Sequence, residues 1–292
     1  MLSDGGVLNL NDLLKKYHER KIAKKKNKLT VLFAETLRMM ITNPKLHNAI
    51  KDSIRHQICI SEKEDFFSYC DKKINDRSAS IEVVNACSFE AAEIYKKSRT
   101  CVLNFACSVE PGGGVLVGSI AQEESLCRAS TLYPCLCSME TYEKFYLPHI
   151  EEKDFLGKDD CIYTPNVIVF QSDTLYPKLR PEKEWFEVGI ITCSAPALNH
   201  TELKNYSLYD LHYRRLNRIL DVAANNRNDV IILGAFGCGA FLNDPNIVAQ
   251  AMFDAVKHYQ YVFKSIIFAI PKSVTNRNYK IFYECFQRYL RQ

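Results

Sequence analysis

The stretch TCVLNFACSVEPGGGVLVGSIAQEES, residues 100–125, decides the fold. It starts with an apolar, strand-like segment at residues 100–106, passes through a glycine loop and continues into a helix expected from about Ile120. Open α/β sheets place their ligand sites where a strand leads through a loop into a helix. Glycines there let backbone amides approach a phosphate, and the helix N-terminus adds a partial positive charge. This stretch therefore predicts an anion-binding loop in an α/β fold.

A second stretch, VIILGAFGCGAF at residues 230–241, has the same order of buried strand and glycine loop. Seven of the 11 glycines fall in these two loops. Asp244 can cap the next helix, and Pro245 suits its first position. The loop lacks the Lys-Ser/Thr ending of a nucleoside-triphosphate loop and the spacing of a dinucleotide fingerprint. The alternatives are a tight turn that needs small residues and a second anion-binding loop.

Strand and helix patterns alternate from Ser80 to the C-terminus, which predicts an α/β fold with helices on both faces of a sheet. Strands are expected at residues 81–85, 100–106, 167–170, 188–192, 230–233 and 265–270. Helices are expected at residues 89–97, 206–224, 247–259 and 278–290. Before Ser80, residues 8–41 have a helical pattern and residues 46–78 are weakly patterned. We therefore expect an N-terminal helical accessory region, residues 1–79, and an α/β domain, residues 80–292.

Composition narrows the class of protein. Hydrophobic residues make up 47% of the 292 residues, enough for a sizeable core, and no run is long enough for a membrane span. A net charge of +4 does not by itself indicate a nucleic-acid-binding protein. The first residues lack a secretory signal pattern, so the 12 cysteines are expected as reduced thiols in an intracellular protein, cytoplasmic or nuclear.

Two local clusters have alternative interpretations. The lysines near the N-terminus are more typical of a solvated helix face than of a nuclear-import signal or a patch that binds a polyanion. They are Lys21, Lys24, Lys25, Lys26 and Lys28. A few cysteines and a histidine lie close in sequence, but their spacing is irregular for zinc ligands. We therefore expect buried free thiols and not a structural zinc site, and no bound metal. They are Cys127, Cys135, Cys137 and His149.

Two acids, Glu123 and Glu124, fall in the first turn of the helix after the glycine loop, where Ser119 and Gln122 have capping-box spacing. Acids favour a helix N-terminus, which explains one glutamate better than two beside a phosphate loop. Repulsion by phosphate and burial raise a carboxyl pKa, whereas the helix dipole lowers it. A carboxyl that keeps its proton near neutral pH can act as general acid on a glycosidic oxygen.

At this point the chain resembles a known family. The triple glycine Gly112, Gly113 and Gly114, a spacer at residues 115–121, and Gln122-Glu123-Glu124 resemble the signature of microbial or bacterial-type poly(ADP-ribose) glycohydrolases. The loop around Gly237-Cys238-Gly239-Ala240-Phe241 resembles that family's diphosphate-binding loop. The resemblance implies a macrodomain fold, with the order of elements matching from about Ile81 to Tyr289, and an N-terminal helical extension.

The resemblance also implies a reaction and a set of site residues. It implies hydrolysis of ribose–ribose O-glycosidic bonds in poly(ADP-ribose), with Glu124 as general acid and Glu123 holding the distal ribose. No metal or cofactor is implied, and ADP-ribose would be the product. The implied substrate-binding residues are Asn104, Gly112, Gly113, Gly114, Gln122, Gly237, Cys238, Gly239, Ala240 and Phe241.

The chain departs from the family pattern at Glu110, where an extra acid at the loop entrance could weaken anion binding or shift substrate preference. The adenine-binding residues are not fixed by a motif. Our guesses are Asn85, Ile168, Phe170, Asn199 and Asn276. In the family, closure over the adenosine end by residues such as Asn276 and Asn278 favours removal of terminal units.

Two other functions remain as alternatives. One is a non-catalytic reader that binds ADP-ribose with the same loops. The other is a hydrolase of a different ADP-ribosyl linkage, for example on an ADP-ribosylated protein. Neither a membrane nor a nucleic acid is the expected partner, although the basic N-terminal segment leaves a nucleic-acid role to be tested.

Overall fold

One mixed sheet forms the centre of the molecule. The computed structural model describes residues 28–153, 155–203, 207–274 and 277–291. Within them, seven strands pair in the order β1-β4-β5-β3-β6-β7-β2. The strands are β1 (Ile58–Ile60), β2 (Ser80–Val84), β3 (Thr100–Ala106), β4 (Cys161–Val169), β5 (Phe186–Ser194), β6 (Val230–Leu233) and β7 (Ser265–Ala269). The strands β5, β3, β6, β7 and β2 are parallel, and β4 is antiparallel to both β5 and β1.

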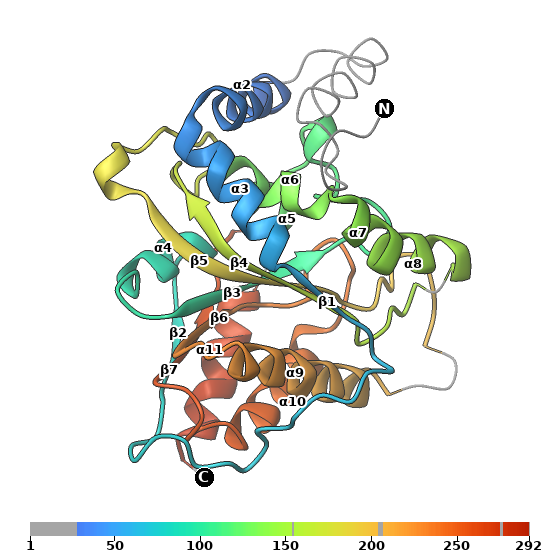
Figure 1. The fold of residues 1–292 in the computed structure, drawn as a ribbon. Coiled ribbons are helices and arrows are strands. Elements are labelled where there is room, and N and C mark those ends of the chain that lie inside the picture. Colours follow the sequence, from blue (N-terminus) through green and yellow to red (C-terminus); the bar gives the residue numbers. More distant parts are fainter. Residues whose placement is uncertain (1–27, 154, 204–206, 275–276, 292) are drawn as a thin grey trace.

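Helices cover both faces of this sheet, as predicted (Figure 1). One face carries α2, α3 and α5–α8, and the other carries α9, α10 and α11. The helices are α2 (Lys28–Thr42), α3 (Pro44–His56), α4 (Ser88–Ile94), α5 (Gln122–Ala129), α6 (Leu132–Leu136), α7 (Met139–Thr141), α8 (Leu147–Glu152), α9 (Leu208–Asn225), α10 (Pro245–Lys257) and α11 (Asn278–Tyr289). Short 3₁₀ turns occur at η1 (Val115–Val117) and η3 (Glu182–Glu184), and η2 (Tyr142–Tyr146) is a π-helical turn.

The strand side chains alternate between two hydrophobic cores. Val102 and Ile232 belong to the core under α2, α3 and α5, whereas Leu103 and Ile231 belong to the core under α9 and α10. This alternation follows from the two-residue period of a strand. Because both faces are covered, the central strand β6 is apolar throughout, and β3 is apolar except at Thr100 and Asn104.

The predicted strands at residues 100–106 and 230–233 agree with β3 and β6, and the other predicted strands overlap β2, β4, β5 and β7. The predicted helices at residues 89–97, 206–224, 247–259 and 278–290 overlap α4, α9, α10 and α11. Asp244 caps α10 by accepting from the Asn246 amide, and Pro245 is its first residue, as predicted. The edge strand β1 was not predicted, because three residues carry too little periodicity to stand out.

The predicted capping box of Ser119 and Gln122 is wrong. Ala121 is the N-cap of α5, without a side-chain cap. Gln122 instead hydrogen-bonds to β3: its Nε2 donates to the Leu103 carbonyl at 2.7 Å, and its Oε1 accepts from the Phe105 amide at 2.9 Å. The β3–β6 ladder ends at Val102, so these two backbone groups of β3 need another partner.

The described part of the N-terminal region packs onto the sheet. Phe33, Leu37 and Met40 of α2 are fully buried in the first core, and β1 extends the sheet next to β4. The division into residues 1–79 and 80–292 stays a prediction. Most of the basic N-terminal segment lies outside the described residues; within them, the Lys28 Nζ lies 4.0 Å from the centre of the Tyr176 ring.

Two chain-wide predictions concern location. No helix in the described ranges combines the length and the apolar character that a membrane crossing needs. No disulfide joins the 12 cysteines, all of which lie in the described ranges. The intracellular location, cytoplasmic or nuclear, stays a prediction.

Candidate active site

A cavity of about 790 Å³ opens at the carboxyl ends of the parallel strands. Its lining includes the loop after β3, the loop after β6 and residues 269–271 at the end of β7. These strands are neighbours in the order β3-β6-β7, so the three segments lie side by side. The volume falls within the roughly 300–1,000 Å³ typical of small-molecule sites. The two glycine loops predicted from the sequence therefore line one cavity.

Most of the predicted site residues meet in this cavity. Those that line it are Gly113, Gly114, Gln122, Glu123, Glu124, Gly237, Gly239, Ala240 and Phe241. The other three, Asn104, Gly112 and Cys238, do not line it. Asn104 is fully buried behind Glu123, and Gly112 lies against Tyr133 and Cys127. The Cys238 thiol points to the Phe236 carbonyl. That these three residues contact the ligand directly stays a prediction.

Glu124 lines the cavity, and its two carboxylate oxygens have different surroundings. The residue is 6% exposed, and its Oε1 accepts a hydrogen bond from the Gly114 amide at 2.7 Å. Its Oε2 is buried and has no hydrogen-bond partner among the described residues. A buried polar atom without a partner is costly, and such atoms concentrate at functional sites. Glu124 thus has one oxygen held by a backbone amide and one oxygen that needs a partner from outside the described residues.

Glu123 is fixed through both oxygens. Its Oε1 accepts from the Asn104 amide group at 3.2 Å, and its Oε2 accepts from the Cys107 backbone amide at 2.8 Å. Burial, with a smaller contribution from the neighbouring Glu124, raises the pKa of Glu123 to about 8, against the lowering effect of these hydrogen bonds. A carboxyl with this pKa is mostly protonated at pH 7. Glu123 can therefore donate a hydrogen bond to a sugar hydroxyl.

A buried arginine balances the acids. Arg128, at the end of α5, is 1% exposed, lines the cavity, and donates from Nη1 to the Ser119 carbonyl at 2.7 Å. Burial lowers the pKa of its guanidinium, while the nearby Glu124 and Asp173 carboxylates raise it. The positive charge also favours an anionic ligand.

The close approach of the loop after β3 to α5 explains why residue 113 is a glycine. Gly113 has φ of +56°, and a Cβ there would lie 2.6 Å from Glu124 Oε1 and 3.0 Å from Glu123 Oε2. A larger residue would push both carboxyl groups away. Glu110, the departure noted from the family pattern, lines the same cavity, so an extra acid does face the site.

The loop after β6 offers backbone amides. Among the described residues, none accepts a hydrogen bond from the amides of Gly237, Gly239, Ala240 or Phe241, and all four residues line the cavity. Asn243 holds the loop by donating to the carbonyls of Pro196 and Phe241. Amides held by a rigid loop near a helix N-terminus bind phosphate groups well. This arrangement can take a diphosphate.

The cavity also contains residues that the sequence analysis missed. Asp173, 2% exposed, accepts from the Phe89 amide and the Ser125 hydroxyl, and so joins α4 to α5. No motif marks this position, because it lies in an irregular loop 50 residues from the glutamates. The others are Arg128, described above, and Cys87, Ser88, Phe105, Cys107, Leu116, Val117, Ile120, Ala121, Ser125, Thr174, Leu175, Ala235, Ala269, Ile270 and Pro271.

The four described residues suggested as adenine contacts do not line the cavity. Ile168 and Phe170 are buried in the first core, and Asn85 accepts from the Lys272 amide outside the cavity lining. Asn199 does not line the cavity either, and Asn276 lies outside the described residues. Asn278, by contrast, lines the cavity, as suggested for a residue that closes over the adenosine end.

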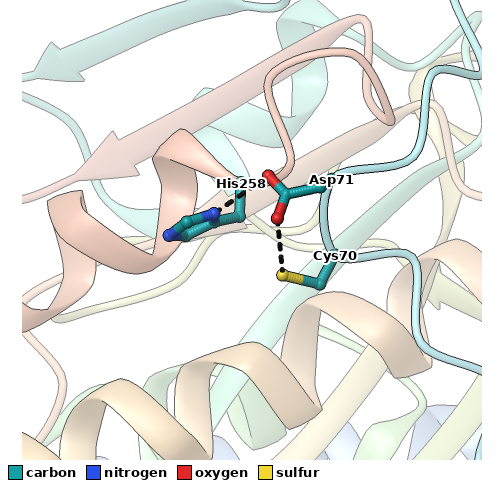
Figure 2. A group of neighbouring side chains, drawn as sticks. All are labelled: Cys70, Asp71 and His258. Atoms are coloured by element: carbon teal, nitrogen blue, oxygen red, sulfur yellow. Dashed lines mark hydrogen bonds and ion pairs between the residues drawn. The ribbon is translucent and has the colours of Figure 1, made fainter.

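One group in the described part of the chain has the composition of a metal site, and it lies away from the cavity. Figure 2 shows Cys70 and Asp71 on the segment before β2, facing His258 at the end of α10. The His258 Nδ1 lies 3.0 Å from Asp71 Oδ1, so this pair already forms a hydrogen bond or ion pair without an ion. Cys127, Cys135, Cys137 and His149 form no such group within the described residues.

A comparison with protein families identifies the relationship. The family model described as microbial-type PARG, catalytic domain, matches residues 14–172, more than half of the chain. The chain belongs to this family. A microbial-type PARG is a poly(ADP-ribose) glycohydrolase, so the predicted family, enzyme class and overall function are confirmed. A comparison with curated proteins finds no match.

Solved structures of poly(ADP-ribose) glycohydrolases share the fold of this microbial-type PARG. The enzyme from Thermomonospora curvata is 24% identical, with a TM-score of 0.80 over 89% of this chain and 100% of that one. The same enzyme bound to the inhibitor ADP-HPD is 25% identical, with a TM-score of 0.76 over 89% of this chain and 99% of that one. The enzyme from Deinococcus radiodurans in complex with ADP-ribose is 26% identical, with a TM-score of 0.72 over 82% of this chain and 97% of that one. The predicted macrodomain-like α/β fold is confirmed.

Proposed function

We propose that this glycohydrolase cleaves the ribose–ribose O-glycosidic bond of poly(ADP-ribose) with Glu124 as general acid and Glu123 as the group that holds the distal ribose. The observation that carries the proposal is that Glu124 lines the cavity and that its buried Oε2 has no hydrogen-bond partner among the described residues. A proton on the Glu124 carboxyl would sit on this oxygen, because Oε1 accepts a hydrogen bond from the Gly114 amide.

The order of the strands supports one orientation of the ligand. The glutamates follow β3, the four amides follow β6, and the apolar Ile270 and Pro271 follow β7. An ADP-ribose unit has the same order of parts, namely ribose, diphosphate and adenosine. With the distal ribose at Glu123 and Glu124, the diphosphate reaches the amides and the adenosine lies on the β7 side. The complex of the Deinococcus radiodurans enzyme with ADP-ribose supports this ligand class.

The reaction then follows from the placement of the carboxyl groups. The bond between the anomeric carbon and the bridging oxygen breaks, its electron pair stays on the oxygen, and Glu124 protonates that oxygen. The developing oxocarbenium ion is stabilised by the diphosphate held nearby. Water adds to the anomeric carbon and returns a proton to Glu124. Glu123, protonated near neutral pH, orients the ribose through a hydrogen bond.

The decisive test is Glu124→Gln, which keeps the size of the side chain and an oxygen for the Gly114 amide but removes the acid. We expect release of ADP-ribose from the polymer to fall by at least 10²-fold, in line with the contribution of general acid catalysis. ADP-ribose affinity, measured by calorimetry, should change by less than about threefold. Glu184→Gln, on the exposed turn η3, is the matched control. Full activity of the Glu124 variant would falsify the assigned role.

The same assays separate the alternatives. A non-catalytic reader would bind ADP-ribose and release no product after long incubation. A hydrolase of another linkage would act on a mono-ADP-ribosylated protein but not on the polymer. Poly(ADP-ribose), or an ADP-ribosylated protein that carries it, is the proposed partner. We favour the polymer because two carboxyl groups and a diphosphate loop line one cavity.

A further inference from the structure

A second, shallower groove lies on α11. Its volume is about 630 Å³, and its lining comes from α11 and from Lys272, in the segment that leads from β7 to this helix. Four cationic side chains line it, Lys272, Lys280, Arg288 and Arg291, against a single acid, Glu284. An excess of positive charge in a groove favours a ligand with several negative charges.

Aromatic rings accompany these charges. Tyr279 and Tyr283, one turn apart on α11, are stacked, with ring centres 5.9 Å apart and planes 13° from parallel. Tyr283 is 42% exposed, and the Lys272 Nζ lies 4.8 Å from the centre of the Tyr279 ring. Exposed rings among cationic side chains are the usual means of binding nucleotide units, because bases stack on the rings and phosphates pair with the cations.

The groove adjoins the active-site cavity. Pro271 and Asn278 line the cavity, and the next residues, Lys272 and Tyr279, line the groove. The Lys272 amide donates to Asn85 Oδ1 at 2.7 Å, which anchors this boundary to the end of β2. β7 is two strand positions from β3 in the sheet. The groove therefore lies on the β7 side of the cavity, away from the loop after β3 and the two glutamates.

We propose that the groove on α11 binds the nucleoside diphosphate unit of poly(ADP-ribose) that extends from the adenosine of the unit in the cavity. This inference rests on the proposed function, in which the adenosine lies on the β7 side. Inside a polymer, that adenosine carries the next unit on its ribose. A site for the next unit lets the enzyme bind a chain away from its terminus. The groove therefore favours internal cutting, contrary to the preference for terminal units that the family resemblance suggests.

Charge reversal tests the groove with a closely matched control. Lys280 pairs with Glu284 four residues later, with side-chain exposures of 61% and 59%. Lys144 pairs with Glu140 at the same spacing, with exposures of 60% and 59%, on the helices of the opposite face. Lys280→Glu should weaken binding of an oligomer of several ADP-ribose units about tenfold and leave ADP-ribose binding unchanged. Lys144→Glu should change neither affinity.

The binding measurements use the full chain with Glu124→Gln as background, ADP-ribose, and ADP-ribose oligomers of defined length. We expect oligomers to bind more tightly than ADP-ribose, with an advantage that shrinks as salt rises. Tyr283→Ala should reduce this advantage about tenfold, since stacking on one ring has an effect of this size. Equal affinities for oligomer and monomer, or equal effects of the Lys280 and Lys144 variants, would overturn the proposal.

Three further outcomes separate this proposal from others. If the chain binds neither ADP-ribose nor oligomers, the proposed function fails and the groove proposal fails with it. ADP-ribose binding without any gain for oligomers overturns the groove proposal alone. A single-stranded RNA of equal charge that binds the groove as tightly as the oligomer would also overturn it, in favour of a nucleic-acid surface.

The products provide an independent readout. With long polymer, the chain with Glu124 intact should release short oligomers early, because internal bonds are cut. Lys280→Glu should shift the early products towards ADP-ribose, and Lys144→Glu should leave the product pattern unchanged. ADP-ribose as the sole early product from all three proteins would contradict the groove proposal, even if the overall rate is high.

Discussion

At the scale of single residues, the environments of the two adjacent glutamates are different. Glu123 has both oxygens hydrogen-bonded, whereas Glu124 has one oxygen bound to an amide and the other without a partner among the described residues. Adjacent residues on a helix point about 100° apart, so each carboxyl group meets different neighbours. The sequence shows two adjacent acids, and only their surroundings in the fold distinguish the residue proposed to hold the ribose from the residue proposed to act as general acid.

The pKa of Glu123 predicts a pH effect on stability. The ordinary pKa of 4.5 is raised to about 8 in the folded chain, so the folded state keeps this proton at pH values where the unfolded state has lost it. The stabilisation from the neutral carboxyl is fully present below pH 4.5 and is lost as the pH rises to about 8. Glu123→Gln should remove this dependence, which denaturant unfolding at several pH values would measure.

The same group should affect binding. Deprotonation of Glu123 above about pH 8 places a negative charge near the diphosphate, so ADP-ribose affinity should fall as the pH rises through this value. In Glu123→Gln this fall should disappear, whereas it should persist in the surface control Glu184→Gln. Identical pH profiles for the Glu123 variant and the unaltered chain would show that another group is responsible.

At the scale of elements, each glycine loop has a different task. The loop after β3 brings backbone against the carboxyl groups, and the loop after β6 leaves four amides without an acceptor among the described residues. Gln122 joins α5 to β3. Beyond the end of the β3–β6 ladder, its side chain takes the place of a strand partner for the backbone of β3. The position of α5, and with it the glutamates, is therefore set by β3.

Two alanine substitutions should separate these tasks. Gly113→Ala places a Cβ 2.6 Å from Glu124 Oε1 at a φ of +56°, so we expect activity to fall about 10²-fold and stability to fall by about 1–2 kcal/mol. Gly239→Ala meets no atom within 4 Å, so stability should change by less than about 0.5 kcal/mol while ADP-ribose affinity decreases. Thermal unfolding, polymer hydrolysis and calorimetry of both variants would check this. A fully active Gly113 variant would contradict the proposed constraint on the carboxyl groups.

At the scale of the whole molecule, the described part of the N-terminal region contributes to the core on one face of the sheet. Phe33 of α2 is fully buried and packs edge-on against Tyr133, 5.1 Å between ring centres, and Tyr133 in turn lies against Gly112. This contact connects α2 to the glycine loop of the active site. If residues 28–60 and the rest of the chain unfold as one cooperative unit, a destabilising substitution in α2 will lower the free energy of unfolding of the whole molecule.

Phe33→Ala tests this coupling. Loss of a buried phenylalanine should reduce the free energy of unfolding by about 3–5 kcal/mol and lower the midpoint of a single transition. Val31→Ala on the same helix, where the side chain is 38% exposed, is the control and should have a much smaller effect. Two separate transitions in the Phe33 variant would instead support an independent accessory region with the boundary near residue 80.

The sequence by itself determined the α/β class, most strands and helices, and the two glycine loops with the acidic pair between them. These features depend on local rules, namely the periodicity of apolar residues, the conformations open to glycine, and motif spacing. Only the tertiary structure decided what depends on groups distant in sequence. It showed that Gln122 completes the edge of β3 instead of capping α5, that Asp173 joins the site, and that Asn104 supports Glu123 from behind. It also set the raised pKa of Glu123, because burial is a property of the whole fold and not of the acidic pair.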